Sequence, residues 1–255
     1  MLLAVDMGNT NITIGVFDGE ALRFESRLAT DHAKMKDQYA IELLDILRLY
    51  RIEPTAFEGA ILSSVVPSLD HTLCAAIRQV TGLQPLIVGP GTKTGINIRI
   101  DDPSQLGADL LVGAVAALAQ YGGPCIVWDL GTATTASVVT AAGEFLGGAI
   151  MPGVSTSLES LIYKASLLQR IRLDAPPAAI STNTIDCMQS GSLFGTAAMI
   201  DGMCDRMERE LGTPVKVIAT GGLGREIIRH CRRDILYDDR LLLTGLRLIY
   251  EKNRK

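Results

Sequence analysis

The sequence predicts an α/β fold made of two related halves, and three observations lead to this prediction. Apolar runs typical of strands alternate with amphipathic helical patterns through the first half of the chain. A strand–turn–strand motif at residues 2–19 recurs at residues 125–144. The chain has 255 residues, 47% of them hydrophobic, which is enough for two halves with cores of their own. We expect the halves to span residues 1–121 and 122–255.

The pattern of residues 2–19 predicts a β-hairpin with a polar tip. An apolar run ends at Asp6, Gly8 follows in the turn, and Asp18-Gly19 closes the second strand. Amides and hydroxyls at the tip come from Asn9, Thr10, Asn11 and Thr13. Backbone N–H groups near a glycine can approach a phosphate, and a carboxylate at a strand end can hold a hydrated cation. Most Asp-x-Gly sequences are ordinary turns, so this hairpin alone is only a candidate phosphate loop.

The second copy of the motif strengthens that hypothesis. In it, Asp129 matches Asp6 and Gly131 matches Gly8, again between two strands. A repeat of this length indicates two half-domains that face each other, with both loops closing on one ligand.

Between the two hairpins, further strands and helices follow in alternation. The predicted strands cover residues 22–28, 58–66 and 85–88, and the predicted helices cover 36–50 and 68–80. The segment Gly89–Gly95 lacks the Gly-Lys-Ser/Thr order of a Walker loop, so we interpret it as a flexible connection. Asp102 and Pro103 then begin a helix expected to reach Tyr121.

Asp109 is the one acidic residue of that helix after its cap. Its neighbours are small or apolar, and an unpaired carboxylate among them would be costly to bury. It either reaches the surface or faces a cleft, where partial burial would suit a general base. The spacing favours neither alternative.

The second half continues with the same kinds of element. We expect a strand at 147–153, helices at 155–168 and 184–211 with a loop at 170–183 between them, and a strand at 215–219. Gly191 and Gly195 allow close helix contact, within the fold or across a dimer. The glycine turn 220–224 opens another helix and would suit the base and ribose end of a nucleotide.

Composition excludes several classes of protein. The formal net charge is −4 and no dense Lys/Arg block is present, which argues against nucleic acid as a partner. No signal peptide or membrane span is apparent, so we expect a cytoplasmic protein. The five cysteines are scattered, which indicates free thiols rather than a zinc site or disulfides: Cys74, Cys125, Cys187, Cys204 and Cys231.

Six linked motifs together resemble those of the type III pantothenate kinases. They are Asp6-x-Gly-Asn-Thr, Gly107-Ala-Asp109, Asp129-x-Gly-Thr-Ala-Thr134, Gly147-Gly-x-Ile-x-Pro-Gly153, Asn183-Thr184 with Gln189-Ser-Gly191, and Thr220-Gly-Gly222. Their order and spacing match the family over nearly the whole chain, and residues 245–253 resemble its last helix.

The resemblance implies a fold of the acetate kinase, sugar kinase and actin superfamily. In that fold two ribonuclease H-like halves hold the nucleotide between them. The family forms homodimers and phosphorylates pantothenate with ATP, the first step towards coenzyme A. It needs Mg²⁺ and a monovalent cation, K⁺ or NH₄⁺.

The resemblance also implies roles for individual residues. Asp109 would be the general base, Asp129 would bind the monovalent cation, and Thr132 would contact ATP. Thr184 would help to bind pantothenate, in its own subunit or across the dimer. The loop residues that would hold the ATP phosphates are Asp6, Met7, Gly8, Asn9, Thr10, Asn11, Ile12 and Thr13, and those that would line the acceptor pocket are Gly107, Ala108, Asp109 and Leu110.

Three positions depart from the family pattern near the expected acceptor pocket. Leu110 stands where the family usually has arginine, Ile100 where it has tyrosine, and Gly113 where it has asparagine. Two further hypotheses therefore stand beside a pantothenate kinase. The chain is a kinase of another small alcohol, or it is a non-catalytic regulator that resembles the Bvg accessory factor.

Overall fold

Two β-sheets, each covered by helices, make up the computed structural model, which describes residues 1–254. Unit 1 contains residues 1–96, residues 101–116 and the segment that begins at Arg240. Unit 2 contains residues 97–100 and 117–239. Both sheets mix parallel and antiparallel strands, which confirms the predicted α/β class.

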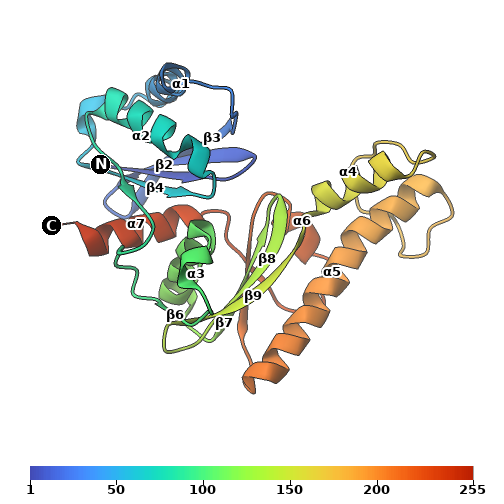
Figure 1. The fold of residues 1–255 in the computed structure, drawn as a ribbon. Coiled ribbons are helices and arrows are strands. Elements are labelled where there is room, and N and C mark those ends of the chain that lie inside the picture. The colour runs from blue at the N-terminus through green and yellow to red at the C-terminus, as the bar shows by residue number, and fades with distance from the viewer. Residues whose placement is uncertain (255) are drawn as a thin grey trace. The chain divides into compact units, whose positions relative to one another are not determined.

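The sheet of unit 1 is organised around its first strand. The strand order is β3-β2-β1-β4-β5, and β1 pairs antiparallel with β2 and parallel with β4. The strands are β1 (Leu2–Met7), β2 (Asn11–Asp18), β3 (Ala21–Ala29), β4 (Gly59–Ser64) and β5 (Leu86–Ile87). Helices α1 (Lys36–Leu49) and α2 (Pro67–Thr81) lie together over one face of this sheet (Figure 1).

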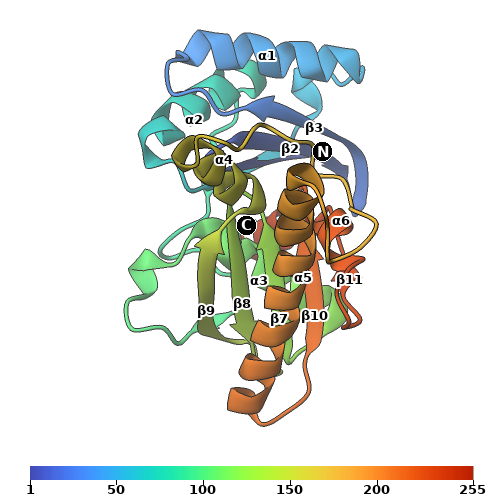
Figure 2. The same ribbon diagram turned by 90° about the vertical axis from the view of Figure 1, so that its right-hand side faces the viewer.

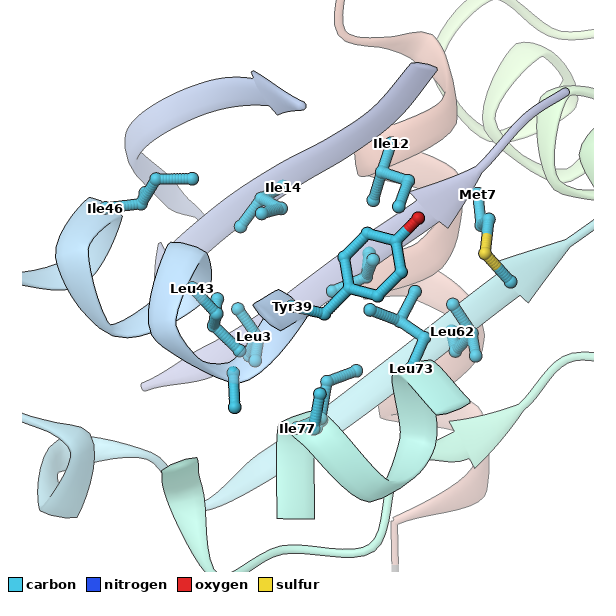
Figure 3. Close-up of a cluster of buried hydrophobic side chains, with 14 of the residues drawn as sticks. Leu3, Met7, Ile12, Ile14, Tyr39, Leu43, Ile46, Leu62, Leu73 and Ile77 are labelled. Atoms are coloured by element: carbon cyan, nitrogen blue, oxygen red, sulfur yellow. The ribbon is translucent and has the colours of Figure 1, made fainter. Parts of the chain in front are cut away.

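Alternation along β1 separates the core of unit 1 from its polar strand end. Leu3 and Met7 point into a cluster with Tyr39 of α1 and Ile77 of α2 (Figure 3). Asp6 therefore points to the opposite face of the sheet. Helix α7 (Leu241–Asn253) covers that face, where a side chain at Gly15 would come within 2.8 Å of Leu243 Cδ1.

Unit 2 repeats the arrangement of unit 1. Its strand order is β11-β10-β7-β8-β9-β6, and β7 pairs antiparallel with β8 and parallel with β10. The strands are β6 (Asn97–Ile98), β7 (Cys125–Leu130), β8 (Ala133–Val139), β9 (Glu144–Pro152), β10 (Lys216–Thr220) and β11 (Leu236–Tyr237). The order β9-β8-β7-β10-β11 matches the order β3-β2-β1-β4-β5 of unit 1, with the same strand directions. The repeat therefore extends from the hairpin to these five strands of each sheet.

Helices cover one face of the second sheet. The long helix α5 (Thr184–Leu211) crosses it, as Figure 2 shows, and its Leu193, Ile200 and Cys204 join the core beneath. Helices α4 (Val154–Lys164) and α6 (Gly224–Ile228) flank it. In the described residues, no helix is long and apolar enough to cross a membrane.

The structure corrects one predicted helix. The segment expected to be helical from Asp102 to Tyr121 is broken into a 3₁₀ turn at Pro103–Gln105 and helix α3 (Ala108–Tyr121). The Asp102 side chain caps the 3₁₀ turn by accepting from Ser104 N, and Leu106 is extended, with ψ 120°. This break places Asp109 in the first turn of α3 rather than in the middle of a helix.

The units also differ from the expected halves in two places. Helix α7, expected within residues 122–255, packs on the sheet of unit 1 because its apolar side chains Leu243, Leu246 and Ile249 are buried there. Residues 97–100 pair through β6 with β9 of unit 2. Strands β6 and β11 have only two residues each, too short for a periodicity to reveal.

Candidate active site

The tip of the β1–β2 hairpin exposes the polar groups that the sequence places there. Asn9, Thr10 and Asn11 are exposed, and Gly8 N donates to Asn11 O at 2.9 Å, which closes the turn. Thr30, next to the end of β3, donates from Oγ1 to Gly8 O at 2.6 Å and from N to Thr10 O at 2.9 Å. The loop is therefore held from outside, with Asn9, Thr10 and Asn11 exposed at its tip.

Two residues of the predicted phosphate loop have side chains that cannot contact a ligand. The side chains of Met7 and Ile12 are completely buried in the core of unit 1. Only their main-chain atoms could reach a nucleotide.

Asp6 has hydroxyl-bearing neighbours on both adjacent strands. It is paired in register with Thr13 of β2 and with Ser63 of β4, and its residue is only 8% exposed. Side chains in register on neighbouring strands share a face of the sheet. Sequence reasoning missed Ser63, because only the pairing of β4 with β1 brings it beside Asp6.

The second hairpin reproduces this arrangement in unit 2. Asp129 is paired in register with Thr135 of β8 and with Thr220 of β10. Gly131 N donates to Ala133 O at 3.0 Å, and Thr132 O accepts from Gly153 N at 3.0 Å and Thr156 Oγ1 at 2.8 Å. Thr132 itself is exposed at the tip.

The glycine turn after β10 lies directly against Asp129. A side chain at Gly221 would come within 2.7 Å of Asp129 Oδ1 and 2.6 Å of Leu130 O, so only glycine fits there. Gly221 also has a positive φ of 93°. The sequence pattern identifies this turn but not its close packing on the second Asp-x-Gly loop.

Tyr237 of β11 holds the glycine turn from behind. Its hydroxyl donates to Gly221 O at 2.9 Å, and its ring packs where a side chain at Gly224 would otherwise lie. The Arg225 guanidinium lies 5.0 Å from the centre of the ring and forms an ion pair with Asp239 at 3.4 Å. No motif in the sequence indicated this contact.

Asp109 is partly buried near the N-terminus of α3. Burial raises the pKa of the Asp109 carboxyl, and hydrogen bonds from the backbone N–H groups of Leu110 and Asp109 oppose that shift. The Leu110 N–H lies 2.8 Å from Asp109 Oδ1. A side chain at Gly107 would come within 2.5 Å of the same oxygen, so a larger residue there would displace the Asp109 carboxylate. Of the two alternatives from the sequence, a carboxylate at the open surface is not what the structure shows.

The three positions that depart from the family pattern fall in both units. Leu110 is partly buried and Gly113 is buried, both on the part of α3 that belongs to unit 1. Ile100 belongs to unit 2, where its Cγ2 lies 3.6 Å from the place of a side chain at Gly147. Its neighbour Arg99 forms an ion pair with Glu144 at 2.9 Å.

Thr184 lines a large cavity in unit 2. Asn183 caps α5 by accepting from Asp186 N at 3.0 Å, and this fixes Thr184 as the first residue of the helix. The cavity has a volume of about 890 Å³ and is walled mainly by α4 and α5, including Leu158, Leu161 and Met188. Its lining is mostly apolar, with hydroxyls from α4, α5 and the segment before α5.

The two Asp-x-Gly loops suit cations that keep water or phosphate ligands. Mg²⁺ is usually held by one or two carboxylates together with substrate phosphates and water. Among the described residues no group of three or more His, Cys, Asp or Glu side chains is placed to hold a metal. The buried hydroxyls of Ser63 beside Asp6 and of Thr135 beside Asp129 have no hydrogen-bond partner, which fits a ligand or its water at both places.

Comparison with known proteins agrees with this architecture. A type III pantothenate kinase of Moorella thermoacetica is 42% identical over 253 residues, which is 99% of this chain and 100% of that protein. A solved Campylobacter jejuni chain assigned to the Baf family of transcriptional activators has a TM-score of 0.63 at 19% identity, with 98% of each chain covered. The ROK hexokinase of Thermus thermophilus has a TM-score of 0.50 at 14% identity, again over 98% of each chain.

The two solved structures are too distant in sequence to show more than the fold, and that fold is the sugar-kinase type predicted above. The sequence profile described as "Type III pantothenate kinase" matches residues 2–206. Together with the full-length relative, this match shows that the chain belongs to the type III pantothenate kinase family.

Proposed function

We propose that this protein transfers the γ-phosphoryl group of ATP to the hydroxyl of pantothenate and forms 4'-phosphopantothenate, the first step of coenzyme A biosynthesis. The observation that carries the proposal is the 42% identity to a type III pantothenate kinase over the full length of both chains. The partly buried carboxyl of Asp109, preceded by Gly107 and Ala108, supplies the acid–base group that such a reaction needs.

ATP is assigned to the two Asp-x-Gly loops. The amides and hydroxyls of residues 8–13 bind its phosphates, with Asp6 behind them, and Thr132 adds a contact from the second loop. Asp6 would hold Mg²⁺, and the bound cation would supply neutralisation of charge on the phosphates. Asp129, walled by Gly221 and beside the unpartnered Thr135 hydroxyl, holds the monovalent cation, K⁺ or NH₄⁺.

Asp109 acts as the general base. In its ionised form it accepts the proton of the acceptor hydroxyl while that oxygen attacks the γ-phosphorus and the bond to the bridging oxygen of ADP breaks. Two backbone N–H groups stabilise the carboxylate without neutralising it, so it stays available for the proton.

A second candidate, a kinase of another small alcohol, is favoured by Leu110. An arginine at this position would offer a charged donor to the acceptor, and losing one such donor typically slows a reaction by about 100- to 1,000-fold. A leucine in the pocket suits a less polar acceptor. The non-catalytic regulator has less support, because Asp6, Asp109 and Asp129 are all present.

We further propose a cytoplasmic homodimer in which Thr184 contributes to pantothenate binding. Leu161 of α4 lines the cavity beside Thr184 and is exposed, and so is Leu167 in the segment after α4. A second copy of the chain would cover these residues.

The test is ADP release by the purified protein with ATP, Mg²⁺ and pantothenate, in K⁺ and then in Na⁺. We expect turnover that requires pantothenate and falls in Na⁺. If ADP is released at a rate that pantothenate does not change, the phosphoryl group is transferred to water. If Leu110→Arg then makes the rate depend on pantothenate, the result favours another alcohol as the natural acceptor. Nucleotide binding with no turnover in either protein would favour the regulator.

A further inference from the structure

Ser63 is a buried hydroxyl for which the fold provides no hydrogen-bond partner. Its residue is 0% exposed, and its Oγ has no partner in the structure. An unsatisfied buried hydroxyl typically costs about 1–3 kcal/mol, and replacing the serine with alanine would remove that cost. A serine at this position therefore calls for an explanation other than stability.

The pairing of the strands places Ser63 beside the carboxylate of Asp6. The two residues are in register on β4 and β1, and Val65 N donates to Met7 O at 3.0 Å, so the pairing continues to the strand ends. Thr13 lies in register on the other side of Asp6. The carboxylate thus lies between two hydroxyl residues on the same face of the sheet.

The neighbouring residue, Ser64, has a structural role at the end of β4 that Ser63 does not share. The Ser64 hydroxyl donates to Asp70 in the first turn of α2 and accepts from Val66 N at 3.1 Å. Ser64 therefore stabilises the start of α2, whereas Ser63, on the opposite face of β4, does not.

Unit 2 contains a related pattern, although its unpartnered hydroxyl lies on the antiparallel neighbour of the central strand rather than on the parallel one. Asp129 lies in register between Thr135 and Thr220, and the Thr135 Oγ1 is likewise buried without a partner. Two sheets of the same topology thus each leave an unpartnered hydroxyl beside the aspartate at the end of their central strand.

We infer that Ser63 is a further residue of the Mg²⁺·ATP site, where its hydroxyl forms a hydrogen bond with a water ligand of the cation held at Asp6. This rests on the proposed binding of ATP to the β1–β2 loop. Mg²⁺ keeps several of its waters when it binds to proteins, and a hydroxyl beside the carboxylate that holds the cation is a suitable partner for such a water.

The experiment measures melting temperature in a non-hydrolysable ATP analogue as MgCl₂ is varied, for the wild type, Ser63→Ala and Ser64→Ala. Ser63→Ala should raise the half-saturating Mg²⁺ concentration by about three- to tenfold, the loss expected for one hydrogen bond. Without nucleotide or Mg²⁺ it should melt at the wild-type temperature or above. Ser64→Ala, the matched control, should melt lower and keep the wild-type Mg²⁺ dependence.

Two results would overturn the inference. One is an unchanged Mg²⁺ dependence in Ser63→Ala. The other is a Ser63→Ala effect on both quantities that Ser63→Cys repairs, because a thiol fills the space but forms only weak hydrogen bonds. If the wild type itself shows no Mg²⁺-dependent stabilisation by the analogue, the proposed ATP site fails instead.

Discussion

Asp109 is the residue at which folding stability and the proposed chemistry oppose each other. Burial raises its pKa above the value of about 3.9 expected in the unfolded chain. Between the two pKa values the folded state binds more protons than the unfolded state. The stabilisation that comes from protonation of Asp109 in the folded state is therefore fully present below the pKa of the unfolded chain. It is lost as the pH rises through the pKa of the folded protein.

Asp109→Asn should therefore raise the melting temperature at pH 7, and the gain should disappear as the pH falls below about 4. The same variant should lose about 100- to 10,000-fold in turnover, because the amide cannot accept the proton. In the wild type, kcat/KM should increase with pH through the raised pKa. Paired melting and activity profiles measure both effects, and a variant that melts lower than the wild type at pH 7 would contradict this account.

The same scale shows which site residues the sequence could reveal. Asp6, Gly8, Asp129 and Gly131 are recognisable because the motif occurs twice along the chain. Ser63 and Tyr237 are not, because each acquires its neighbour only through pairing or packing of distant strands. A lone serine in an apolar run and a tyrosine in a two-residue strand carry no local signal.

At the scale of elements, a substitution in the turn after β10 would show how far the second Asp-x-Gly loop depends on the packing of that turn. Gly221→Ala would force a side chain against Leu130 O and Asp129 Oδ1 at a φ of 93°. We expect a loss of stability well above the roughly 1 kcal/mol of an ordinary positive-φ glycine, and a higher K⁺ concentration for half-maximal activity. Denaturant unfolding and K⁺ titration measure the two effects.

Gly212→Ala is the matched control for that variant. Gly212 ends α5 with a φ of 66° and has no atom near the position of an added side chain. It should lose only the backbone contribution and keep the K⁺ dependence of the wild type. Equal losses in the two variants, with no change in K⁺ response, would mean that Gly221 serves the turn alone.

Elements with strong local signals were predictable, and those set by other parts of the chain were not. The helix Thr184–Leu211 has a capping Asn183 and a following Gly212, and the prediction of its bounds is confirmed. The prediction that a helix begins at Asp102 was wrong, because the cap of a 3₁₀ turn resembles that of an α-helix. Nothing in residues 106–107 reveals that the chain extends there before α3 begins.

At the scale of the whole molecule, the repeat predicted the architecture better than it predicted the boundaries. Strand order and directions agree between the two sheets from β3 to β5 and from β9 to β11. The last helix nevertheless returns to unit 1, where a β-sheet face needs cover, although it follows unit 2 in the chain. Hydrophobic periodicity shows that α7 has an apolar face but not which sheet buries it.

The proposed dimer makes a prediction about the whole molecule. The side chains of Tyr163, Leu167 and Ile180 are 85%, 95% and 91% exposed. Large apolar side chains that are exposed together often mark a surface that a partner covers. If a second copy covers them, light scattering coupled to gel filtration should give about twice the chain mass of 27.3 kDa. Leu161→Asp with Leu167→Asp should give the single-chain mass, because two carboxylates would be buried unpaired in the interface.

The matched control is Leu49→Asp, which places the same charge on an apolar residue of α1 that is 75% exposed in unit 1. It should leave the dimer intact. If the double variant is a folded single chain and pantothenate turnover falls with it, while ATP analogue binding persists, Thr184 acts on the partner's acceptor site. The dimer proposal is contradicted if the wild type remains a single chain at micromolar concentration and has full turnover. Thr184 would then act in its own subunit, and no second copy would cover the cavity.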